Sequence, residues 1–187
     1  MAVTISITED DVFTAFNQFL TGILADGVEI VKAQENRVPE PVSDDWVELT
    51  PLFKPRLDTN TVTYFDPTVQ DPPQTGAGVR NVQTSFAFHV QLDVHGPNSG
   101  DNAAIITQLF RDDYAYQVFT AINPDISPLY CDEPKQMAFI NGENQYEDRW
   151  IITSVLQYNP VTQTPQDFAD AVSVGIISVD AAYPPGA

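Results

Sequence analysis

The sequence predicts a single α+β domain in which an antiparallel or mixed β-sheet packs against two main amphipathic helices. The first observation is the alternation over residues 81–95, where even positions are apolar or β-branched and odd positions are nearly all polar. A period of two indicates a long strand with one buried face. Elsewhere, two segments place apolar residues at helical spacing. The chain has 187 residues, 43% of them hydrophobic, so we expect one core within residues 1–187.

A first helix is expected over residues 9–25. Thr8 is followed three residues later by Asp11, which resembles a capping box, and an apolar stripe of helical period follows. Gly27 ends this helix. Residues 28–33 are expected to be extended, and two short strands should follow at residues 46–53 and 61–65, because β-branched and aromatic residues are bounded there by prolines.

The segment from Asp66 to Gly78 contains three prolines and two glycines and few apolar residues. It is too long for an ordinary connection, so we expect an exposed arm that orders only against a neighbouring subunit or ring. A surface loop without that role is the alternative.

After the long strand, Gly96 to Asp101 supplies turn residues and a cap, with Ser99 as a capping candidate, and an apolar stripe then predicts a second helix. Asp112 and Asp113 end that helix and cap a shorter one. A loop with Pro124 and Pro128 comes next. Residues 146–158 read as a strand with apolar residues on both faces, as in a central or interface strand. The last β-rich run is 171–179, followed by a short tail at 181–187.

Charge and composition exclude several classes of function. The chain carries 26 acidic and eight basic residues, a formal charge of −18, which disfavours direct nucleic-acid binding because phosphates must be neutralised. The lone Cys131 cannot form an intrachain disulfide, and the first residues show no secretion signal, so synthesis in the cytoplasm is expected. No window reaches the ~20 apolar residues that cross a bilayer.

The candidate chemical sites are weak. His89, Asp93 and His95 share one strand face, but His89 and His95 are about 20 Å apart at ~3.3 Å per residue, too far to share one metal ion. Asp93 and His95 would need a third ligand from elsewhere. Acidic neighbours raise rather than lower the pKa of Cys131. We therefore predict no catalytic, cofactor-binding or metal-binding residue.

A family resemblance rests on short runs of residues in the same order along the chain. They are Gly27 to Pro39, Asp93-Val94-His95-Gly96, Asn102-Ala103-Ala104, Arg111-Asp112-Asp113-Tyr114, Pro128-Leu129-Tyr130, Asn141 to Trp150, and Gln157-Tyr158-Asn159. Together they resemble the tail-terminator (neck) proteins of tailed bacteriophages. The resemblance extends from about Val12 to Asn159, and the segment after Asn159 has no counterpart in it.

The resemblance implies a structural virion protein of the neck. It implies a homohexameric ring that caps the tail tube, ends tail polymerisation and joins the tail to a head-side connector, while genomic DNA passes through without specific binding. The expected partners are further copies of the chain, the tail tube protein, the head-side neck protein and, in contractile tails, the sheath protein. The expected subunit and ring contacts are Asp66, Pro72, Pro73, Gly76, Gly78, Arg149, Ile151, Thr153 and Val155.

Two alternatives stay open. The first is another ring component of the same particle, namely a head-completion protein or a tail-tube subunit. A tube subunit would form filaments when purified. The second is a small metal-dependent hydrolase that uses scattered acids, for which tight stoichiometric metal binding would be the evidence.

Overall fold

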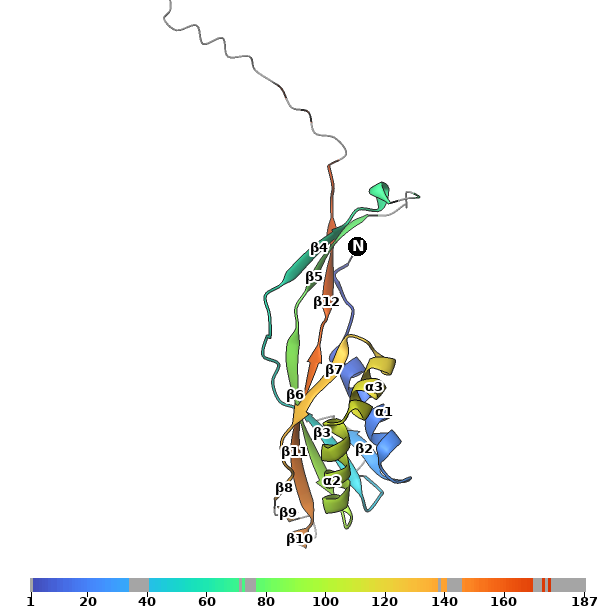
Figure 1. Cartoon of the computed structure of the whole chain (residues 1–187), viewed down its shortest axis with the longest axis vertical. Helices are drawn as coiled ribbons and strands as arrows, with labels where there is room; N and C mark the ends of the chain where they lie inside the picture. Colours follow the sequence, from blue (N-terminus) through green and yellow to red (C-terminus); the bar gives the residue numbers. More distant parts are fainter. Residues whose placement is uncertain are drawn as a thin grey trace, which may run out of the picture.

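The computed structural model describes residues 2–33, 41–70, 72, 77–137, 139–140, 146–169, 173 and 175. These residues form an elongated molecule with two parts (Figure 1). The body contains the α-helices and the larger sheet, and the arm is a smaller sheet that extends away from the helices. The expected α+β class is confirmed.

Within the described residues the body has three α-helices: α1 (Glu9–Ile23), α2 (Ser99–Phe110) and α3 (Asp113–Ile122). The predicted capping box at the start of α1 is confirmed. The Thr8 hydroxyl accepts a hydrogen bond from the backbone N–H of Asp11, and the Asp11 carboxylate accepts one from the backbone N–H of Thr8. Asp112 caps α3 by accepting a hydrogen bond from the Tyr114 N–H, as the recapping prediction requires.

The larger sheet has the strand order β2-β3-β6-β11-β7, with β8 also paired to β11. All pairs are antiparallel except β2 with β3. The bounds are β2 (Glu29–Lys32), β3 (Trp46–Pro51), β6 (Phe86–His95), β7 (Ile126–Cys131), β8 (Lys135–Gln136) and β11 (Arg149–Tyr158). A short hairpin of β9 (Phe139–Ile140) and β10 (Tyr146–Glu147) lies at the end of the body remote from the arm.

The arm is the antiparallel sheet β1-β12-β5-β4. Its strands are β1 (Thr4–Ile5), β12 (Val161–Gln166), β5 (Gly78–Gln83) and β4 (Thr61–Phe65), and the one-turn 3-10 helix η1 (Pro67–Val69) follows β4. The expected 66–78 loop is thus the connection between β4 and β5 at the tip of the arm. Residues 71 and 73–76 lie outside the described residues.

One continuous ribbon joins the two parts. Gly78 pairs with Gln166 at the arm tip and His95 pairs with Arg149 at the far end of the body, with the same register throughout. We call residues 78–95 and 149–166 the central ribbon. At ~3.3 Å per residue the ribbon is about 56 Å long. The strands are interrupted at Thr84 and Ser85, which lie opposite Pro160 and Asn159; Pro160 has no N–H to donate.

The core lies between the helices and one face of the larger sheet. Strand β6 contributes Phe88, Val90, Leu92 and Val94 from its even positions, so the predicted alternation is confirmed. Helix α1 meets them with Val12, Phe13, Phe16, Phe19 and Leu20. Aromatic rings from α1, α2 and α3 pack against one another, with the rings of Phe16 and Phe119 at 5.6 Å and those of Phe19 and Phe119 at 5.2 Å. Burial of these side chains is the main stabilising contribution.

Four sequence expectations need correction. The predicted loop with Pro128 is strand β7, which tolerates a proline because it is the outermost strand of its sheet. Ser99 does not cap α2: it is the first helical residue, and Asn98 occupies the cap position without a side-chain bond. The single strand expected at residues 81–95 is two strands, β5 and β6, interrupted where Pro160 faces them. Strand β12 was not foreseen. The β-rich run at 171–179 lies mostly outside the described residues, and the 181–187 tail lies wholly outside them.

Candidate assembly surface

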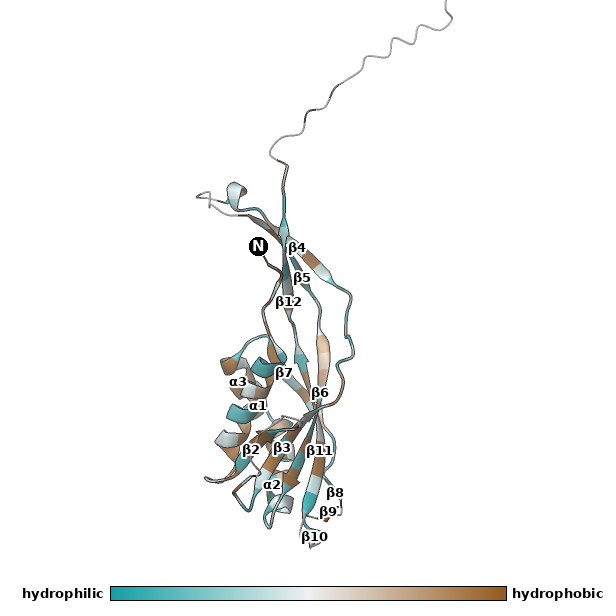
Figure 2. Ribbon diagram, turned by 180° about the vertical axis from the view of Figure 1, so that it is seen from behind, coloured by the Kyte–Doolittle hydropathy of each residue, from teal (hydrophilic) through white to brown (hydrophobic). Residues whose placement is uncertain are grey.

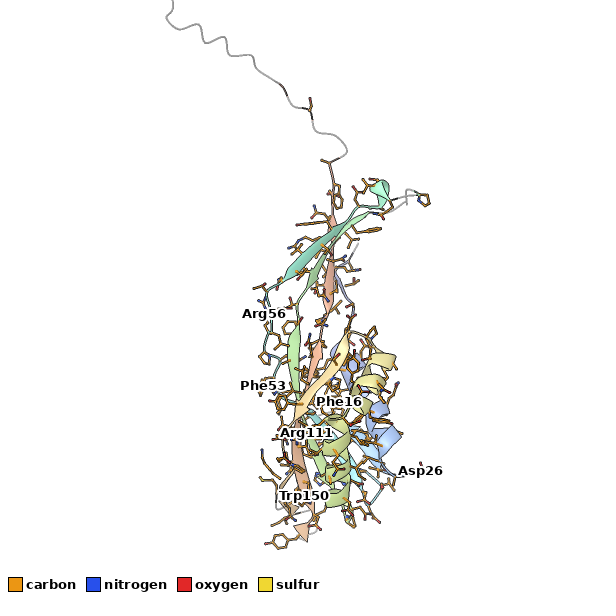
Figure 3. The ribbon with its side chains drawn as sticks, in the orientation of Figure 1. Phe16, Asp26, Phe53, Arg56, Arg111 and Trp150 are labelled. Carbon is orange, nitrogen blue, oxygen red and sulfur yellow. The ribbon has the colours of Figure 1, made fainter. Side chains whose placement is uncertain are left out.

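The face of the larger sheet turned away from the helices, here called the outer face, carries both neutral and charged side chains. It carries Gln91, Ile151 and Thr153, all half-buried, from β6 and β11. Phe53, from the segment after β3, stacks on His89 with ring centroids 4.1 Å apart, and it remains 56% exposed. Figure 3 shows Phe53 and Arg56 on the side of the ribbon opposite the helices. Around Phe53, Gln91 and Thr153 this face therefore combines apolar and neutral polar groups, and none of the described α-helices covers it.

A polar cluster closes the outer face at the end remote from the arm. His95 is buried, its ring stacks on Trp46 with centroids 3.8 Å apart, and its Nδ1 lies 3.3 Å from Oε1 of Glu147. Burial lowers the pKa of His95, and the nearby Glu147 carboxylate opposes that shift. The contact links β6 to the β9–β10 hairpin, and the Phe139 ring packs edge-on against His95.

Arg149 and Asp93 form the charged part of this cluster. The Arg149 Nε donates to Asp93 Oδ1 at 2.8 Å, its Nη2 donates to the same oxygen, and Gln91 Nε2 donates to Asp93 Oδ2 at 2.7 Å. The pKa of Glu48 on β3 is raised by burial and by the Asp93 charge. These partners satisfy the cluster internally. Among the described residues no three His, Cys, Asp or Glu side chains are grouped so as to hold a metal ion.

The predicted contact residues fall into two groups at opposite ends of the ribbon. Arg149, Ile151, Thr153 and Val155 lie on the outer face of β11, in the arrangement that the sequence predicted. Val155 is only 1% exposed, so its own chain covers it, whereas Ile151 and Thr153 are half-buried. Arg149 is held by Asp93. That these residues contact a neighbouring subunit stays a prediction.

The second group lies at the arm tip. The Asp66 carboxylate accepts hydrogen bonds from the N–H and the hydroxyl of Thr68 and so caps η1. At Gly78 the ring of Phe168 approaches so closely that an added Cβ would lie 2.2 Å from it, so only glycine fits there. Asp66 and Gly78 line one shallow cavity of about 190 Å³. Pro72 is exposed, and Pro73 and Gly76 lie outside the described residues.

The arm strands contain no acidic residue, although the chain has 26. Their only charged residue is Arg80, which forms no ion pair with any described carboxylate. By contrast, Lys32, Lys54, Arg111, Lys135 and Arg149 all do so, and Arg56 donates to the Asp58 backbone oxygen and to Asn60. In an antiparallel sheet, directly opposed residues share a face, so the pairings place Ile5, Val62, Tyr64, Arg80 and Val82 on one face. We call this face the tyrosine face. The sequence analysis did not identify this face, because β1 and β12 were not foreseen. The one signal available in the sequence was that residues 149–166 contain no Asp or Glu.

None of the described α-helices covers either face of the arm. Figure 2 shows the arm strands from behind with the helices confined to the body. Tyr64 is 60% exposed, Ile5 52% and Val62 37%. A sheet with uncovered faces lacks the second layer that normally buries its apolar side chains.

The remaining features do not suggest chemistry. Burial raises the pKa of the Cys131 thiol, whose Sγ points at the backbone oxygen of Thr107 at 3.7 Å, so the thiol is not activated. The cavity between α1 and β2 is about 460 Å³, and its ionisable residues, Asp10 and Lys32, are paired with each other at 2.8 Å. In the part of the chain that the structure describes, no helix has both the length and the apolar character needed to span a membrane.

Comparison with known proteins gives one match. A family model described as phage neck terminator protein matches residues 10–180, which include every described element from β2 to β12 and nearly all of α1. No curated protein matches the sequence significantly. The matched segment covers most of the 187 residues, and the resemblance seen in the sequence points to the same proteins. The chain therefore belongs to the phage neck terminator protein family.

Proposed function

We propose that this protein caps the phage tail tube as a ring, most simply of six copies, and so ends tail polymerisation and joins the tail to the head-side connector. The observation that carries the proposal is the family match over residues 10–180. The protein acts through its surfaces rather than through catalysis, and its place of action is the neck of the virion. Its partners are other copies of the chain, the tail tube protein, the head-side neck protein and, in contractile tails, the sheath protein.

The charge of the chain supports a role around passing DNA. Each copy contributes a formal charge of −18, so a ring of six copies is strongly acidic. DNA that passes through such a ring is repelled by the wall rather than retained, because binding would require basic groups that neutralise phosphates. The inner wall is accordingly net negative.

The test is a phage in which this gene carries a stop codon, grown with and without a plasmid that supplies the protein. Without the protein we expect unjoined heads and tail tubes of uncontrolled length in electron micrographs, and the plasmid should restore joined particles. Tails of normal length already attached to heads would contradict the proposal. Long filaments formed by the purified protein alone would instead favour a tail-tube subunit.

A further inference from the structure

We propose that the arm is the surface by which one copy of the chain docks on a second copy, with the tyrosine face as the contact and an acidic surface of the neighbour as its receptor. This inference rests on the proposed ring and names the contact that builds it. It concerns the arm sheet, β1, β4, β5 and β12, rather than the connection between β4 and β5.

The composition of the tyrosine face is that of a protein interface. Interface cores are enriched in Tyr and Arg and depleted in Lys, Glu and Asp. The arm strands contain none of those three depleted residues, and the tyrosine face presents Tyr64 and Arg80 on neighbouring strands, opposite one another in the β4–β5 pairing. Ile5 and Val62 add exposed apolar surface on the same face.

Charge selects a second copy as the occupant. Two bodies that approach each other oppose acidic surfaces, because each copy carries 26 acids against eight bases. The arm strands contain no acidic residue, so an arm that approaches a neighbouring body does not meet this repulsion. Arg80 has no described carboxylate partner in its own chain, and a neighbouring body supplies many. Two of the acids that border the arm are engaged locally: Asp58 accepts hydrogen bonds from Ser85, and Asp66 caps η1.

The size of the arm indicates a weak contact that ring closure reinforces. The four strands have 2, 5, 6 and 6 residues, and at ~3.3 Å per residue and ~4.8 Å between strands one face measures roughly 300 Å² in plan. A stable pairwise interface buries about 800 Å² per partner. One arm thus supplies less than half of that area, so an isolated pair should dissociate readily. In a closed ring each copy makes two such contacts at once, and the contacts reinforce one another.

The test places a photo-crosslinking amino acid, p-benzoylphenylalanine, at position 64 in a phage that assembles particles. The matched control is position 116 on α3, because Tyr116 is also a tyrosine and is 52% exposed, but lies on the helical side. Irradiation of purified particles should link the position-64 chain to itself, giving bands at multiples of 20.7 kDa. The position-116 chain should give no such series.

A second pair of variants tests the charge. Arg80→Glu should lower incorporation into particles by at least about tenfold, while Arg80→Lys restores most of it and the circular dichroism of all variants stays that of the wild type. Lys135→Glu makes the same charge change on the body, where the side chain is 65% exposed, and should incorporate normally.

Links from position 64 only to a different protein, or no links while the chain is present in particles, would overturn the docking assignment and leave the neck function standing. Equal incorporation of the two Glu variants would also overturn it. Absence of the wild-type chain from particles would instead refute the proposed function.

Discussion

A Phe→Ala substitution should lower the free energy of unfolding much more on the core side of β6 than on the outer face of the sheet. Phe88 is 0% exposed and packs against the rings of Phe13 and Tyr158, with ring centroids at 6.1 Å and 5.8 Å. The Lys54 ammonium lies 4.6 Å from the centre of the Phe88 ring. Phe88→Ala removes these contacts and leaves a cavity, so the free energy of unfolding should fall by about 3–5 kcal/mol. For a chain of this size that is a drop of about 6–20 °C in melting temperature.

Phe53→Ala is the matched control on the outer face. Phe53 stacks on His89, the residue next to Phe88, but it is 56% exposed. Its truncation removes one ring contact and roughly half the buried apolar area of a fully buried Phe, so the free energy of unfolding should fall by about 1–2 kcal/mol. Urea unfolding followed by the fluorescence of Trp46 and Trp150, both in the larger sheet, measures the two values. Equal losses would refute the assignment of the even positions of β6 to the core.

Four further outcomes follow from the structure. Thr8→Ala should cost about 1 kcal/mol because the cap of α1 loses its acceptor, and an unchanged urea midpoint would contradict this. Burial lowers the pKa of His95 below its ordinary value of 6.5, so its contribution to stability is complete above pH 6.5 and is lost as the pH falls toward the folded-state pKa. The decline between pH 7 and 5 should be shallower in His95→Gln, and an unchanged slope would show that another group, such as His89, dominates. Deleting residues 69–75, in the connection between β4 and β5, should leave the melting temperature nearly unchanged while abolishing tail capping. Normal capping by the deletion variant would show that this connection makes no required contact with a neighbouring subunit or ring. The purified protein should show no salt-sensitive affinity for duplex DNA, measured by fluorescence anisotropy at low ionic strength, where repulsion is least screened.

The body was largely predictable because its signals are local. The alternation along residues 86–95, the Thr8–Asp11 capping box and the apolar stripes each depend on neighbours within a few positions, and the structure retains all three. The arm was harder to foresee. Strand β12 has the sequence Val-Thr-Gln-Thr-Pro-Gln, which has little apolar content, and it is a strand because it extends the register set by β11 with β6.

The candidate site was predicted in part for the same reason. The outer-face positions Ile151 and Thr153 follow from parity along one strand, which a sequence shows directly. The burial of Val155 by its own chain and the grouping of Ile5, Tyr64 and Arg80 depend on pairings between distant segments. A single sequence contains no measurement of those pairings.

The pairing of β1 with β12 sets when the proposed docking surface is first complete during synthesis. Thr4 is made among the first residues and pairs with Gln163, near the end of the described chain. A nascent chain cannot complete the arm until residue 166 has left the ribosome. Chains truncated before β12 should therefore lack the proposed docking surface and should not enter the proposed ring.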